Sequence, residues 1–224
     1  MSTKFLRLRS KGICHCKNRR IFQCIDMPIH QTPTKVMIGG HDIRDSGLRV
    51  DISAAIIHAN FSFPDARLLP NGVNPWNDIA VIKLSQPVTY NEHVRPICIN
   101  NITRDLENDN VDCVVAGWGC ISTIRDACNY RQFYPHIPYN MLLRPNKEYC
   151  RFPESMICAG IAGKNGPTVR DSGGPLICRP RYSTEPWSLV GLVHGVFTGY
   201  YGVAFTKVSH HWDWIVEVLA KYYD

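Results

Sequence analysis

The sequence lacks any long apolar run, and its charge is only mildly unbalanced. No stretch approaches the roughly 18 consecutive apolar residues of a membrane-spanning helix, so we predict no membrane span. The 224 residues carry 25 basic and 19 acidic side chains, which gives a net charge of +6. An ordinary solvated surface explains this small excess better than a nucleic-acid surface does, so we predict no nucleic-acid partner.

The N-terminal segment lacks the apolar core of a secretory signal peptide, and residues 1–20 are instead strongly basic. The chain nevertheless has ten cysteines, a number that favours a disulfide framework and a secreted, extracellular location. Two short sequons, at Asn60 and Asn101, are compatible with secretion. A disulfide-rich chain needs an export signal. We therefore expect that the sequence begins inside a longer protein or with an altered exon.

A metal site is suggested only by Cys14-His15-Cys16, with Cys24 and His30 as further candidate ligands. Their spacing fits no common zinc pattern, so disulfide-bonded or free cysteines explain the cluster better. We therefore predict neither a metal nor an organic cofactor.

Short apolar or alternating segments, separated by turns, indicate a chain built mainly of β-strands. The segments are residues 36–38, 48–57, 78–84, 111–119, 156–160, 187–193 and 202–208. Sixteen glycines and fifteen prolines, scattered along the chain, suit a fold with many turns. The last element is a helix that Ser209 can cap. Its apolar face consists of Trp212, Ile215, Val216, Leu219 and Tyr222.

This pattern predicts an all-β fold of two packed antiparallel β-barrels, followed by a C-terminal helix. We expect a divergent basic segment over residues 1–34 and one domain over residues 35–224. Within the domain, the N-terminal barrel extends to about residue 108. The C-terminal barrel covers about 111–208, and the helix covers 209–223.

The segment Asp171-Ser172-Gly173-Gly174-Pro175-Leu176 has two glycines directly after its serine. They let the backbone turn sharply and leave Ser172 clear of side-chain crowding, as a nucleophile requires. Such residues are also common in surface turns. The order of all six, however, is more specific than a turn requires.

Five segments in this order resemble the chymotrypsin/trypsin-like serine protease family. They are Asn77-Asp78-Ile79-Ala80, Gly117-Trp118-Gly119, Met156-Ile157-Cys158-Ala159-Gly160, Asp171 to Leu176, and Trp212-Asp213-Trp214-Ile215. The resemblance runs from about Lys35 to the C-terminus. It implies two packed six-stranded antiparallel β-barrels, of which the N-terminal one is incomplete in this chain. Asp78 and Ser172 lie 94 residues apart, close to the roughly 93 that separate the catalytic Asp and Ser of the family. The resemblance implies that Ser172 is the nucleophile and that Asp78 orients the base.

The base is where the sequence departs most from the family, which carries its histidine in an Ala-Ala-His-Cys segment. The best local match, Ile21-Phe22-Gln23-Cys24, puts Gln23 in the histidine position, and an amide cannot accept and return a proton near neutral pH. The alternative base is His30, 48 residues before Asp78, where the family has roughly 45. His30 lacks the following cysteine and is otherwise a loop histidine.

The oxyanion positions fall on Arg170 and Ser172. The family has a donor glycine where Arg170 stands, and a side chain is tolerated there only at negative φ and can block the site. Loss of one donor typically raises the barrier by about 2.7–4 kcal/mol.

The acid before the nucleophile, Asp171, pairs in the family with an N-terminal ammonium released on activation. No such activation segment precedes Gln23, so we expect Asp171 to lack its partner, which is costly for a buried carboxylate.

The segment that aligns substrate corresponds to Val193-His194-Gly195, and the base of the specificity pocket to Asn165 or Gly166. Neither pocket residue is acidic, so a preference for Lys or Arg is not predicted.

Two family disulfides are implied, Cys150–Cys158 and Cys113–Cys178. Cys120 and Cys128 lie close enough in sequence to pair locally, and Cys98 sits where two-chain members tether a propeptide.

We therefore expect a trypsin-like serine endopeptidase domain that cleaves polypeptides through an acyl-enzyme on Ser172. Gln23 and Arg170 predict that this chain is impaired, with little or no proteolytic activity. The alternative is a catalytically inactive homologue that binds a protein partner through the same surfaces. A third hypothesis is a fragment that does not fold stably.

Overall fold

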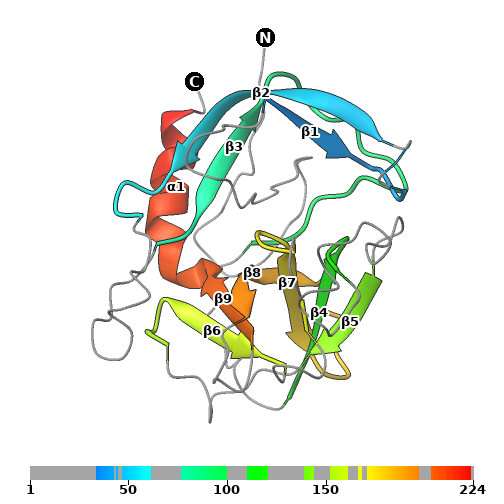
Figure 1. Cartoon of the computed structure of the whole chain (residues 1–224), viewed down its shortest axis with the longest axis vertical. Helices are drawn as coiled ribbons and strands as arrows, with labels where there is room; N and C mark the ends of the chain where they lie inside the picture. The colour runs from blue at the N-terminus through cyan, green and yellow to red at the C-terminus, as the bar shows by residue number, and fades with distance from the viewer. Residues whose placement is uncertain are drawn as a thin grey trace.

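In the residues that the structure describes, the chain forms two antiparallel β-sheets and one C-terminal helix (Figure 1). The computed structural model describes residues 34–42, 44, 47–61, 77–99, 110–120, 139–143, 152–160, 166–167, 171–196 and 203–222. The first sheet consists of β1 (Lys35–Ile38), β2 (Leu48–Ile57) and β3 (Ala80–Leu84). The second consists of β4 (Val111–Gly117), β5 (Tyr139–Leu143), β6 (Met156–Ala159), β7 (Pro175–Pro180), β8 (Ser188–Val196) and β9 (Val203–Lys207).

The first sheet has the order β1-β2-β3, and its long central strand bends at a β-bulge. The register between β2 and β3 shifts between Ile52 and Ala54, which leaves Ser53 as the extra residue. The Ser53 hydroxyl donates to the carbonyl of Lys83 over 3.1 Å. A bulge of this kind increases the local twist of a strand. It therefore helps the sheet curve around its core, which contains Val36, Ile38, Val50, Val88 and Val94.

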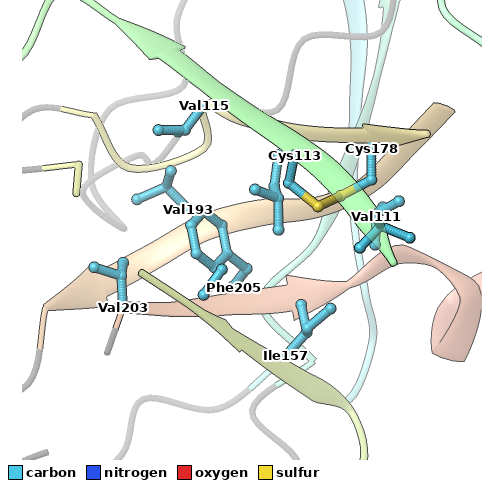
Figure 2. Packing of buried hydrophobic residues seen from close by; sticks show 11 residues of the cluster. Val111, Cys113, Val115, Ile157, Cys178, Val193, Val203 and Phe205 are labelled. Carbon is cyan, nitrogen blue, oxygen red and sulfur yellow. A yellow bond between two sulfur atoms is a disulfide. The ribbon is translucent and has the colours of Figure 1, made fainter. Parts of the chain in front are cut away.

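The second sheet has the order β5-β4-β7-β8-β9-β6 and curls into a half-barrel. Figure 2 shows its core, where side chains from several strands surround the fully buried ring of Phe205. Cys113 of β4 and Cys178 of β7 are directly opposite in the register and form a disulfide. This confirms the predicted Cys113–Cys178 bridge. Cys98, Cys120 and Cys158 are also disulfide-bonded, while Cys128 and Cys150 lie outside the described residues.

The chain ends in a 3₁₀ turn, η3 (Val208–His211), that continues into the helix α1 (Trp212–Lys221). Figure 1 shows α1 beside β2 and β3, so this C-terminal element covers the first sheet. Its buried residues Ile215 and Leu219 pack in one cluster with Ile79, and with Leu189 and Leu192 of β8. The helix thus joins the two halves of the fold.

Two details of the helix differ from the sequence prediction. Ser209 does not cap α1, because it lies inside η3 and the N-cap of α1 is His211, which makes no side-chain capping bond. Val216 is 38% exposed, whereas Val218 is buried. The buried face of the helix is thus centred on Ile215, Val218 and Leu219, and Val216 lies at its edge.

The prediction of an all-β fold with two β units and a C-terminal helix is confirmed. Within the described residues, the first unit contributes three strands and the second contributes six. Strand β7 was not predicted, because it begins at Pro175 directly after a run of turn residues. In the part of the chain that the structure describes, no helix is long and apolar enough to cross a membrane.

Candidate active site

The loop that carries Ser172 is a tight turn directly before β7. Gly174 donates its backbone N–H to the carbonyl of Asp171 over 2.8 Å, which closes the turn around Ser172. Gly173 has a φ of 78°, a left-handed conformation that glycine adopts without steric cost. A Cβ on Gly174 would lie 2.8 Å from the Asp171 carbonyl oxygen. Both glycines that follow the serine are therefore required by the backbone geometry of the turn.

Strand β8 holds this turn in place through two backbone hydrogen bonds. Gly173 donates its N–H to the carbonyl of Val193, and the N–H of Val193 donates to the carbonyl of Gly174, both over 2.8 Å. The side chain of Val193 is buried in the core of the second sheet (Figure 2). The position of the Ser172 turn is thus fixed by a strand that is itself anchored in the core.

The carboxylate of Asp171 is buried beneath the same turn, with the residue only 3% exposed. Gly119 donates its backbone N–H to Asp171 Oδ1 over 2.8 Å. A Cβ on Gly117 or Gly119 would come within 2.0 or 2.2 Å of a carboxylate oxygen. The sequence predicts that Asp171 has no partner, and the structure corrects this, since a backbone N–H from the end of β4 supplies one.

Asp78 lies in a turn at the entrance to β3. Ile79 donates its N–H to the carbonyl of Asn77 over 2.8 Å, so the chain turns tightly at Asp78. Asn77 has a φ of 42°, a region where Asn is one of the few tolerated residues. Its side-chain amide donates to the carbonyl of Asn60 over 3.1 Å. Local backbone geometry thus presents the Asp78 carboxylate at the end of the strand.

His194 of β8 contacts Asp78 directly. The distance from His194 Nδ1 to Asp78 Oδ2 is 2.7 Å, and the side chains are 11% and 35% exposed. The register between β8 and β9 shifts between Val193 and Gly195, so His194 is the extra residue of a β-bulge. Bulges re-aim side chains, and here the bulged residue reaches across to the first half of the fold.

The neighbouring packing places His194 on the correct face of β8. Leu192 packs in the same cluster as Ile79, on the face opposite to Val193. His194 lies two residues after Leu192, and Asp78 lies directly before Ile79. The cluster that contains Leu192 and Ile79 therefore brings together the two segments that carry His194 and Asp78.

The structure brings the Ser172 turn and Asp78 to the same strand, β8. Gly173 and Gly174, which follow Ser172, bond to Val193, and Asp78 bonds to the next residue, His194. Gly195 lies on β8 as well, and a Cβ on Gly166 would come 2.8 Å from Val203 Cγ2 of β9. The remaining predicted residues lie outside the described ranges: Gln23, His30, Asn165, Arg170 and the Cys14-His15-Cys16 cluster. No group of three or more metal-ligating side chains occurs among the described residues.

A second group of histidines near Asp78 was not found from the sequence. The rings of His58 and His211 lie 5.5 Å apart between centroids, and those of His210 and His211 lie 5.1 Å apart. The pKa of His211 is lowered to about 4, mainly by burial and then by the charges of His210 and His58, against the opposing effect of Asp78. Burial and then His210 also lower the pKa of His58. The buried His211 is therefore neutral near pH 7.

Comparison with known proteins agrees with this geometry. The family model for trypsin matches residues 22–215 of the chain. The chain belongs to the trypsin-like serine protease family. This trypsin-like domain is 32% identical over 202 residues to ovochymase of Halocynthia roretzi, covering 86% of the chain and 12% of that protein. It is 35% identical over 164 residues to human testisin, covering 67% of the chain and 50% of testisin.

A third relative of the trypsin-like domain is vitamin K-dependent protein C of Mus musculus. The two are 32% identical over 197 residues, which is 80% of the chain and 40% of the mouse protein. The trypsin-like domain therefore spans half or less of the length of these three relatives.

Proposed function

We propose that the domain hydrolyses peptide bonds in polypeptides by acyl transfer through Ser172. The observation that supports this most directly is the common attachment of the serine turn and the acid to β8. Val193 bonds to Gly173 and Gly174 of the turn, and His194 bonds to Asp78. A nucleophile and an orienting carboxylate held on one rigid strand are what this chemistry requires. The reaction needs no metal and no organic cofactor.

We further propose that turnover is slow compared with an intact family site. Arg170 stands where the family has a donor glycine, and Gln23 stands where it has histidine. Loss of one oxyanion donor alone typically lowers kcat by about 10²–10³-fold. In this proposal the pocket base is Asn165 or Gly166, so cleavage has no preference for Lys or Arg.

The second candidate is a catalytically inactive homologue that binds a protein partner through the same surfaces. The same two residues favour it, because Gln23 cannot act as a base and the Arg170 side chain can block the oxyanion site. In either case we place the domain in an oxidising, extracellular compartment. The buried Cys113–Cys178 disulfide supports this location.

Peptide hydrolysis by the purified chain tests the choice between the two candidates. The chain is incubated with a mixture of unstructured peptides, and cleavage products are identified by mass spectrometry beside the Ser172→Ala variant. We expect slow cleavage by the wild-type chain and none by the variant. Absence of cleavage by a folded wild-type chain would favour the inactive homologue. Equal cleavage by both chains would contradict catalysis by Ser172.

A further inference from the structure

The bond between His194 and Asp78 indicates which ring nitrogen of His194 carries a proton. A carboxylate has only acceptor lone pairs, so Nδ1 of His194 must carry the proton that it donates over 2.7 Å. In the neutral ring the lone pair is then on Nε2. This is the arrangement of a general base whose second nitrogen is oriented by an acid.

The backbone places this imidazole beside the serine turn. Val193, the residue before His194, exchanges hydrogen bonds with Gly173 and Gly174, the two residues after Ser172. Ser172 directly precedes the bonded glycines, and His194 directly follows the bonded Val193, so the two residues lie next to each other along this pairing. The bulged residue His194 bonds to Asp78, so its side chain reaches toward the segment that contains Ile79.

No other described histidine has this relationship to the acid. His211 is influenced by the charge of Asp78, but it is 3% exposed and its Nε2 has no hydrogen-bond partner among the described residues. The low exposure of His194 itself, 11%, limits competition from water for the same bond.

We propose that His194 acts as the general base for Ser172, with Asp78 holding its ring. The inference rests on the proposed acyl-transfer function and assigns to β8 the role that Gln23 cannot fill. Ser172 Oγ attacks the carbonyl carbon of the peptide while its proton passes to His194 Nε2. The peptide C–N bond then breaks, and the same proton passes to the departing amine. Water hydrolyses the ester by the same route, giving one proton to Nε2 and returning it to Ser172 Oγ.

The test measures the rate at which a fluorophosphonate modifies Ser172, as a function of pH. The arms are the wild-type chain, His194→Gln, His194→Ala with and without added imidazole, and Asp78→Asn. A matched control is His93→Gln, because the exposed ring of His93 pairs with Glu92 at 3.4 Å and lies outside the proposed site. Thermal unfolding of each variant confirms that it is folded.

We expect His194→Gln to lose about 10²–10⁴-fold in rate, the range that a general base contributes. The remaining rate of this variant should no longer rise with deprotonation of a histidine. Imidazole should restore part of the rate of His194→Ala, which a purely structural role of His194 would not allow. The His93→Gln control should match the wild-type chain.

A wild-type rate and pH profile in folded His194→Gln would overturn the assignment while leaving Ser172 as the nucleophile. The assignment would also be overturned if His30→Ala lowers the rate of Ser172 modification and His194→Gln does not, since His30 would then be the base. A folded wild-type chain that is not modified at Ser172 under any condition would instead overturn the proposed function itself, and with it the role of His194.

Discussion

Gly119 donates its backbone N–H to the buried carboxylate of Asp171 over 2.8 Å, joining segments 52 residues apart. The bond ties the chain that leaves β4 to the residue that precedes Ser172. No Cβ fits at Gly119 while Asp171 keeps its position, since it would lie 2.2 Å from Oδ2. Glycine at this point and aspartate before the serine are thus two parts of one structural requirement.

Gly119→Ala is therefore expected to displace Asp171 and distort the serine turn. Overpacking of this kind typically destabilises a protein by about 1–3 kcal/mol, and we expect slower modification of Ser172 by a fluorophosphonate. Urea unfolding and labelling rates measure the two effects. In an Asp171→Ala background the added methyl group should cost much less, because the carboxylate is gone. Equal costs in the two backgrounds would show that the contact with Asp171 is not responsible.

The serine turn was also the part of the site that the sequence specified best. Gly173 and Gly174 are local requirements of the turn, and local requirements are visible in the order of residues. The contact between His194 and Asp78 was not predicted. It depends on a β-bulge in β8 and on the hydrophobic cluster that contains Leu192 and Ile79, and both arise from the pairing of segments far apart in the chain.

The stability of the fold should fall in acid because of His211. Its pKa is about 4 in the folded protein, below the ordinary value of 6.5, so between these values the unfolded chain binds a proton that the folded chain does not. The free energy of unfolding should be insensitive to this group above pH 6.5. As the pH falls toward 4, it should decrease by up to about 3 kcal/mol. Urea midpoints measured from pH 7.5 to pH 4.5 give this slope.

His211→Phe should flatten that slope, because phenylalanine fills a similar volume and cannot bind a proton. Neighbouring groups that also act on His211 are His58, His210 and Asp78, and these stay in place in the variant. The exposed His93 provides the control, and His93→Gln should keep the wild-type slope. An unchanged slope in His211→Phe would assign the acid sensitivity to other groups.

The Cys113–Cys178 disulfide should contribute substantially to the stability of the second sheet. It closes a loop with a sequence separation of 65 residues, and both cysteines are almost fully buried. Replacing both by alanine should lower the free energy of unfolding by about 2–4 kcal/mol. Denaturant unfolding of the double variant checks this value. A midpoint equal to that of the wild-type chain would mean that the β4–β7 pairing alone holds the sheet.

The two halves of the fold were predicted with different success for a physical reason. Strand β2 was predicted with its observed limits, because the strand pattern of a long segment is visible in the sequence without its pairing partners. Strand β7 was missed because Pro175 follows a run of turn residues, and only its pairing with β4 and β8 makes the segment a strand. The helix was predicted as an element, but its start was not, since the 3₁₀ turn at Val208–His211 is set by packing rather than by a cap.

The most direct test of the account is to identify the residue that a fluorophosphonate modifies in the folded chain. Tandem mass spectrometry of the digested adduct locates the modified side chain. We predict a single phosphonyl group on Ser172, absent in Ser172→Ala and in chain unfolded by urea before treatment. Modification that is absent from the folded wild-type chain, or that occurs on another residue, would contradict the claim that β8 holds Ser172 as a reactive nucleophile.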